Sequence, residues 1–262
     1  MMKHLTLLIA FLMMIGSQVS AFDPAHLQKL KDTKQCAQCD LQGAYLQGAN
    51  NLEGANLEGA NLAKANLNWA HLQGATLRGA NLEGAYLEEA HLDAANLQGA
   101  NLYGASLRYA NLQGANLKRA NLEAAYLRDA NLEGSNLNAA NLEGANLEGS
   151  KLNMANLQGA KLRGANLQHA YLEGANLRMV KLEGADLRGA NMEGADLFGS
   201  NLEAADLGGA HLEGSNLNLT NLSGANLEAA DLRGANLEGA KMKGAILCNT
   251  IMPDGSVIYS GC

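Results

Sequence analysis

Residues 141–150 read Asn-Leu-Glu-Gly-Ala-Asn-Leu-Glu-Gly-Ser, which is two consecutive copies of a five-residue unit. The same unit extends in both directions, so that Leu or Met occupies every fifth position from Leu52 to Leu247. Of these 40 positions 38 are Leu, and the exceptions are Met192 and Met242. A short period kept over most of a chain indicates a solenoid, in which each repeat packs on its neighbours.

A period of five fits neither a straight helix nor a straight strand. Residues five apart are rotated by roughly 140° on an α-helix, which leaves no stripe to bury. In a strand, an odd period sends successive leucines to opposite faces. Both objections disappear if the chain turns a corner once per repeat, with Leu and the preceding Ala inside and the Asn between them outside.

Glycine dominates the predicted corners, where a positive φ is often needed. Typical positions are Gly54, Gly59, Gly74 and Gly79, whereas other residues occupy the equivalent positions Lys64, Trp69, Met154 and Met179. The only two prolines, Pro24 and Pro253, lie outside the repeats, as expected if the repeat N–H groups join a ladder.

The unit, as in Ala55-Asn56-Leu57-Glu58-Gly59, resembles the A(D/N)LxX motif of the pentapeptide-repeat family over about residues 40–249. The resemblance implies an all-β fold, a right-handed quadrilateral β-helix with four repeats per coil, here about ten coils of about 20 residues. We therefore expect four segments: a signal peptide (1–21), an N-terminal cap with Cys-x-x-Cys (22–39), the β-helix (40–249) and a C-terminal cap (250–262).

Outward residues that depart from Asn give independent support for a 20-residue coil, because several recur at multiples of 20: His71, His91 and His211; Tyr86 and Tyr126; Lys161 and Lys181. Leu41 and Leu46 precede a one-residue insertion at Asn50-Asn51. We expect a bulge there.

Residues 1–21 have the features of a secretory signal peptide: Lys3, an apolar segment over 5–15, and Val19-Ser20-Ala21 as the cleavage site. The alternative is a membrane anchor, but the apolar run is short for a span. We expect cleavage after Ala21, a periplasmic or secreted protein, and no membrane-spanning segment in the mature chain.

Both ends of the predicted solenoid carry a cap, which an open β-edge needs against aggregation. Asp23-Pro24 predicts the start of a short helix over residues 24–33, which places Leu27 and Leu30 on the first coil. At the other end, residues 251–259 contain a Pro-Asp-Gly turn between apolar residues and predict a small hairpin lid.

The four cysteines lie in these caps, and an even count in an exported protein predicts disulfides within the pairs Cys36/Cys39 and Cys248/Cys262. The length of the rod excludes a zinc site that uses all four. A redox-active Cys-x-x-Cys at Cys36 and Cys39 remains an alternative, although it lacks the usual βαβ setting. Haem attachment is excluded because Asp40 stands where His is required.

The sequence contains no grouping typical of an enzyme active site, and we expect no catalytic residue, metal or cofactor. A core of Leu and Ala leaves no interior pocket. The formal net charge of −7, or −8 without Lys3, and the absence of a basic stripe argue against nucleic-acid binding.

The 20-residue spacing turns variable positions into surface patches. Aromatic and Arg side chains are enriched at binding hot spots, and one face groups Trp69, Tyr86, Arg108, Tyr109, Tyr126 and Arg128. A small apolar patch on another face, of the kind that marks partner sites, comprises Met179, Phe198 and Leu219. The alternative explanation for both patches is random sequence drift at variable positions, without a function.

Two further groupings have simple surface explanations. His71 and His91, with Asp93 nearby, could bind a divalent metal, but an open face favours ordinary surface histidines. Glu173, Glu193 and Glu213 form a carboxylate column that could attract a cation or a basic partner, or is merely tolerated because repulsion in water is weak.

We therefore predict an exported, non-enzymatic scaffold that presents flat faces to a protein or cell-envelope partner, with an oligomer as an open possibility. The family resemblance implies one alternative, a DNA mimic that binds gyrase, which the export signal opposes. The other is a redox or metal-binding protein through Cys36 and Cys39.

Overall fold

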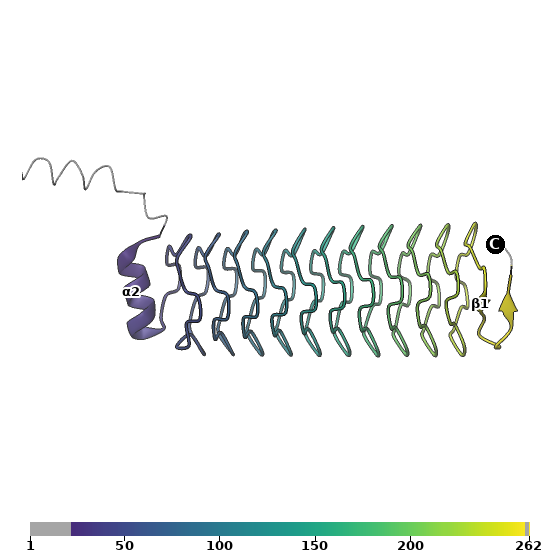
Figure 1. Ribbon diagram of the computed structural model, residues 1–262, viewed down its shortest axis with the longest axis horizontal. Coiled ribbons are helices and arrows are strands. Elements are labelled where there is room, and N and C mark those ends of the chain that lie inside the picture. The colour runs from purple at the N-terminus through teal and green to yellow at the C-terminus, as the bar shows by residue number, and fades with distance from the viewer. Residues whose placement is uncertain (1–21, 260–261) are drawn as a thin grey trace, which may run out of the picture.

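The computed structural model describes residues 22–259 and 262, and the expected signal peptide lies outside the described residues. The molecule is a long rod of stacked turns with helix α2 (Pro24–Thr33) at one end and a hairpin of β1 (Thr250–Ile251) and β2 (Val257–Ile258) at the other (Figure 1). No helix within this described part is long and apolar enough for a membrane span.

Parallel pairing between residues 20 apart holds the turns together. His71 pairs with His91, and His91 pairs with Asn111. The backbone N–H of Leu72 donates to the carbonyl of His91 (2.8 Å), and the same bond recurs along the rod. Each side contributes one bridge residue rather than a long strand because a corner follows within the repeat. The fold is a β-helix-like solenoid.

The interior is a dry stack of Leu and Ala side chains. Leu127 and Ala130 are fully buried, and their equivalents are buried from Leu52 to Leu232. Small polar residues in the Ala position are also buried, and Ser200 donates its hydroxyl to the carbonyl of Leu177 (2.6 Å). Burial of each Leu contributes about 1.5–3 kcal/mol, so the stack supplies most of the driving force for folding.

The outward Asn has two structural tasks. Asn96 Oδ1 accepts the backbone N–H of Gln98 (3.2 Å), which closes the corner that follows. The same oxygen accepts Asn116 Nδ2 from the next coil (3.3 Å). Asp keeps these bonds, as at Asp196, whose Oδ1 accepts the N–H of Phe198 and Asn216 Nδ2. His, Tyr or Lys at this position gives them up, so these departures are informative.

The insertion changes the register of the first coil only. Tyr45 pairs with Asn66, 21 residues on, whereas Asn56 pairs with Thr76, 20 residues on. Asn50 and Asn51 form a turn, and Asn51 Nδ2 donates to the carbonyl of Lys31 in α2 (3.3 Å). The extra residue is therefore absorbed in a wider corner beneath the cap.

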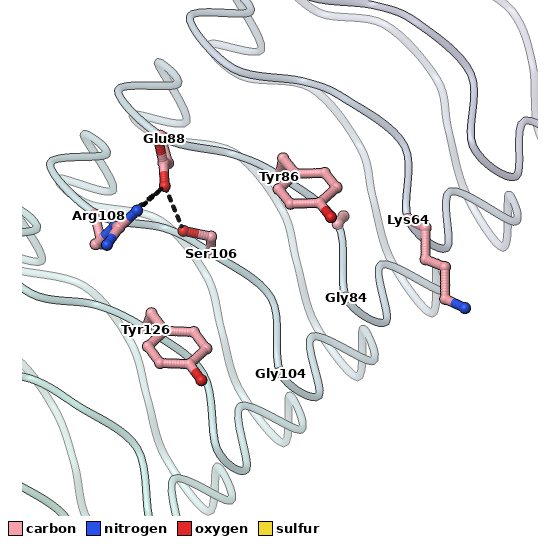
Figure 2. A pocket seen from close by; sticks show the side chains of 9 residues that line it. Lys64, Gly84, Tyr86, Glu88, Gly104, Ser106, Arg108 and Tyr126 are labelled. Carbon is pink, nitrogen blue, oxygen red and sulfur yellow. Dashed lines mark hydrogen bonds and ion pairs between the residues drawn. The ribbon is translucent and has the colours of Figure 1, made fainter.

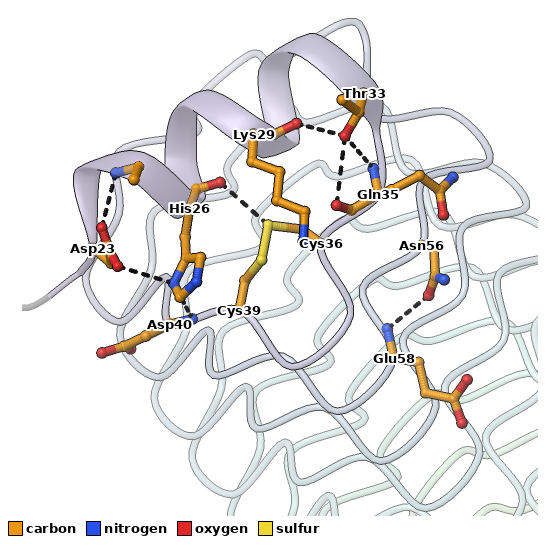
Figure 3. The surroundings of a disulfide bond; sticks show 11 residues. Asp23, His26, Lys29, Thr33, Gln35, Cys36, Cys39, Asp40, Asn56 and Glu58 are labelled. Atoms are coloured by element: carbon orange, nitrogen blue, oxygen red, sulfur yellow. Dashed lines mark hydrogen bonds and ion pairs between the residues drawn. A yellow bond between two sulfur atoms is a disulfide. The ribbon is translucent and has the colours of Figure 1, made fainter.

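Helix α2 closes the N-terminal end. Asp23 accepts the N–H of Ala25 (2.8 Å) as the N-cap, and Leu30 is fully buried against the first coil. Cys36 and Cys39 are joined by a disulfide directly below the helix (Figure 3). His26 ties the helix to this segment, because its Nδ1 accepts the N–H of Asp40 (3.1 Å).

The small C-terminal hairpin continues only one side of the last coil. Ile251 pairs with Asp231, so the hairpin continues one side of the rod. On the other sides, Leu237, Met242 and Leu247 are only partly buried, and within the described residues their N–H groups have no hydrogen-bond partner. The hairpin is tied down by the disulfide between Cys248 and Cys262.

Candidate binding face

One side of the rod carries tyrosines on alternate coils. We call it the tyrosine face and define it by the outward positions Tyr45, Asn66, Tyr86, Ser106 and Tyr126, which pair consecutively through parallel bridges. The three tyrosine side chains are 66%, 52% and 53% exposed. The Asn and the Ser between them are small.

A shallow surface depression of about 480 Å³ lies on this face (Figure 2). The two rings in it have the same orientation, and both hydroxyls point toward the glycine corner. On this side Gly84 and Gly104 have no side chains, and Lys64 is the charged residue beside them. Glu88 and Arg108 bound the other side. The lining comprises Lys64, Gly84, Ala85, Tyr86, Glu88, Gly104, Ser106, Arg108 and Tyr126.

The charges along the edge of the face are paired with one another. Glu88 Oε1 accepts Ser106 Oγ (3.0 Å) and Arg108 Nε (3.1 Å). The hydrogen bond from Arg108 is the main cause that lowers the pKa of Glu88, against a smaller opposing effect of burial. One coil further, Arg128 lies 3.4 Å from Asp129 and 3.5 Å from a second carboxylate, that of Glu148.

This arrangement predicts a pH effect. Substituting Arg108→Gln should raise the pKa of Glu88 toward its ordinary value of 4.5. Because the folded pKa is depressed, the stabilising contribution is present above pH 4.5 and is lost as the pH falls through the folded value. Carboxylate titration by NMR measures the shift. Arg233→Gln is the control, since Arg233 pairs with Asp231 and should leave Glu88 unchanged. An unshifted Glu88 in Arg108→Gln would refute the pairing.

The corner next to this face is strained over four consecutive coils. Trp69, Glu89, Tyr109 and Asp129 stack at one corner with φ of 57°, 55°, 60° and 56°. A side chain other than Gly raises the conformational free energy of this left-handed backbone. Residues in such conformations are often found at functional sites. No other corner of the rod has four successive residues other than Gly, counted over the described repeats.

Relief of this strain should stabilise the protein. Tyr109→Gly is expected to raise the free energy of unfolding by about 0.5–1 kcal/mol, the left-handed penalty less the entropy cost of Gly. Chemical denaturation measures it. The reverse change, Gly114→Ala, is the control, because a Cβ there meets nothing within 4 Å and tests φ alone. A less stable Tyr109→Gly would mean that the ring makes a compensating contact.

Comparison with known proteins identifies the family to which this repeat fold belongs. The pentapeptide-repeat family model matches the chain in overlapping segments from residue 35 to residue 252. The chain belongs to the pentapeptide-repeat family.

Several solved structures of pentapeptide-repeat proteins are similar to it. HetL, which is involved in heterocyst differentiation regulation in the cyanobacterium Nostoc, is 37% identical over 88% of this chain and 97% of its own, with a TM-score of 0.40. QnrB1, a plasmid-mediated fluoroquinolone resistance protein, is 22% identical over 78% and 91%, with a TM-score of 0.46. A thylakoid-lumen protein of Arabidopsis thaliana is 27% identical over 47% and 71%, with a TM-score of 0.30. Comparison with curated proteins finds no match.

Within this pentapeptide-repeat rod, the predicted aromatic group is divided between the face and its corner. Tyr86, Tyr126 and Arg108 line one depression. Tyr109 follows Arg108 in the chain and occupies the adjoining corner. Trp69 lies two coils from Tyr109 in the same corner column, with Glu89 between them.

The predicted apolar patch is less continuous than the sequence indicated. The guanidinium of Arg178 covers the Phe198 ring at 4.4 Å from its centroid. Met179 leans over Gly199, whereas Leu219 leans away toward Gly239, where a Cβ would lie 2.7 Å from its Cδ2. We therefore assign no site to this patch.

The remaining groupings are surface pairs. The His71 and His91 rings lie next to each other, with centroids 4.8 Å apart and planes tilted by 51°. Asp93 accepts a hydrogen bond from Asn111 (3.2 Å). Among the described residues no cluster of three or more His, Cys, Asp or Glu could hold a metal ion. Glu213 pairs with Arg233 (3.3 Å), so the carboxylate column is partly neutralised.

Sequence reasoning missed Tyr45, the third aromatic residue of the tyrosine face. Counting back 20 from Asn66 falls on an interior position, because the insertion at residues 50–51 shifts the first coil by one. Counting in repeat units instead of residues would have placed Tyr45 correctly. Glu88 and Ser106 were also missed, since each fits the ordinary variation of the repeat.

Proposed function

We propose that this pentapeptide-repeat protein is an exported, non-enzymatic scaffold whose tyrosine face binds a component of the cell envelope. The observation that supports this proposal best is that two different exceptions to the repeat pattern lie next to each other. Tyr replaces the bond-forming Asn on the face, and the adjoining corner holds four strained residues. Local rules are most often broken where function demands it.

The surroundings suit binding better than catalysis. The depression is shallow and open, whereas enzyme sites bury most of a substrate. Aromatic rings beside Arg are typical of hot spots. The proposed export rests on residues 1–21, with their basic start, apolar segment and small-residue cleavage site.

Fractionation with N-terminal sequencing tests the compartment. The proposal expects a mature chain that begins at Phe22 and is found outside the cytoplasm. The face is tested by capture from envelope extract with the wild type and with the variant Tyr86→Asn/Tyr126→Asn. Equal capture by both proteins, or an uncleaved cytoplasmic chain, would contradict the proposal.

The two alternatives have less support. The net charge of −7 is the one feature that favours a DNA mimic directed at gyrase. Cytoplasmic location of the uncleaved chain would revive this alternative. A redox role for Cys36 and Cys39 is disfavoured because both are buried and joined to each other. Reduced, titratable thiols in purified protein would be required for it.

A further inference from the structure

The tyrosines of the face have a regular spacing along the rod axis. Tyr45, Tyr86 and Tyr126 occupy every second coil, so their backbone positions are about 9.6 Å apart at the usual strand separation. The Tyr45 hydroxyl donates to Gln47 Oε1, so this ring leans toward the opposite edge of the face from the Tyr86 and Tyr126 hydroxyls, which point toward the glycine corner. Asn66 and Ser106 separate them. Four of the chain's tyrosines stand at outward Asn-type positions, and three of these four share this face.

A second depression extends the surface toward the N-terminal cap. It measures about 410 Å³ and includes Lys31, Tyr45, Gln47 and Asn50 in its lining. Each of the three tyrosines of the tyrosine face therefore lines a surface depression. An elongated ligand parallel to the rod axis would contact all three rings.

The spacing discriminates between elongated ligands. In a bound peptide strand, side chains on one face recur about every 6.8 Å, which does not match the rings. A bound helix requires a groove that encloses its apolar side, and the depressions along this face are shallow and open. In a β-1,4-linked polysaccharide, successive pyranose rings face opposite ways, so the same sugar face recurs once per disaccharide. That repeat is close to two coils.

A sugar also matches the chemistry of the tyrosine side chains and of the polar residues along the edge of the tyrosine face. An aromatic ring offers apolar surface to the C–H face of a pyranose, and the Tyr hydroxyl offers a polar end. Along one edge lie Gln47, Asn68, Glu88 and Arg108, which provide donors and acceptors for hydroxyl groups. Glu88 and Arg108 pair with each other, which leaves Lys64 as the one remaining charged residue in the lining of the main depression. A single cation is far less than a polyanion needs, so the face favours a neutral ligand.

We propose that the tyrosine face binds a neutral β-1,4-linked polysaccharide that lies along the rod axis, with one disaccharide for every two coils. This inference rests on the proposed function and names the ligand class of the same face. The three tyrosines stack on alternate sugar rings, and the edge side chains hydrogen bond to the hydroxyl groups.

The test uses the mature chain, with cellohexaose and chitohexaose as soluble probes in calorimetry and with cellulose and chitin in sedimentation. The key variant is Tyr45→Asn/Tyr86→Asn/Tyr126→Asn. It introduces the consensus residue at each position, which can restore the Asn hydrogen bonds and keeps the rod folded. The control is Tyr171→Asn, which removes a tyrosine of similar exposure (48%) from another side of the rod.

The proposal expects the wild type and Tyr171→Asn to bind at least one hexasaccharide equally well, with affinity that rises with oligomer length. The triple variant should bind at least about tenfold more weakly at an unchanged melting temperature. No binding by the wild type, or equal binding by the triple variant, overturns the inference. If the wild type instead captures an envelope protein through the same tyrosines, the polysaccharide is wrong and the proposed scaffold function stands.

Discussion

Leu127→Ala is expected to lower the free energy of unfolding by about 3 kcal/mol, within the range of buried Leu→Ala changes in well-packed cores. Leu127 is fully buried in the middle of the rod. Its backbone N–H is bonded to the carbonyl of Asn146 on the next coil (2.6 Å), so the coils cannot close on the cavity without breaking the ladder. Guanidinium titration measures the loss.

Leu127→Met is the matched control. Methionine already occupies an equivalent interior position at Met192, where it is fully buried, so this change should cost less than about 1.5 kcal/mol. A loss below about 1 kcal/mol for Leu127→Ala would show that the stack is looser than the structure implies. In a solenoid the central defect should also divide unfolding into steps, because each coil contacts only its neighbours.

The second large effect is expected at the C-terminal end. Removal of the Cys248–Cys262 disulfide by serine substitution should destabilise the hairpin by about 3 kcal/mol in the chain-entropy estimate, since the bond closes a loop between residues 14 apart. Hydrogen exchange at Thr250 and Ile258 reports the change. Their exchange should accelerate while the central coils stay protected.

The N-terminal disulfide is the comparison. Cys36 and Cys39 are only 3 residues apart, so the same estimate gives about 2 kcal/mol, confined to the end beneath α2. Unchanged exchange at Ile258 after removal of Cys248–Cys262 would mean that hairpin pairing alone holds the lid.

The scaffold was predictable from the sequence because one constraint recurs at every coil. A position such as Leu127 can only be interior, and Asn96 can only be exterior, once the chain turns a corner in each repeat. The family match and the parallel pairing of residues 20 apart agree with this reasoning. The partly open last coil was not predictable, since the lid length alone does not say how many sides it covers.

The candidate site was predicted in part. The 20-residue rule placed Tyr86 and Tyr126 together but missed Tyr45, because a single inserted residue changes which counting rule applies. The lean of Met179 and Leu219 depends on the left-handed corner geometry, and the ion pair of Glu88 with Arg108 depends on rotamers. Neither is encoded in the spacing of the repeat.

Every surface patch described above depends on one claim, that residues 20 apart lie side by side on adjacent coils. This claim can be tested with the unmodified protein. Solution NMR should show a direct ring-to-ring cross-peak between His71 and His91, whose ring centroids are 4.8 Å apart. His71 should show none to His211, seven coils away at about 4.8 Å per coil. Assigned rings without the His71–His91 cross-peak would contradict the coil register and, with it, the tyrosine face.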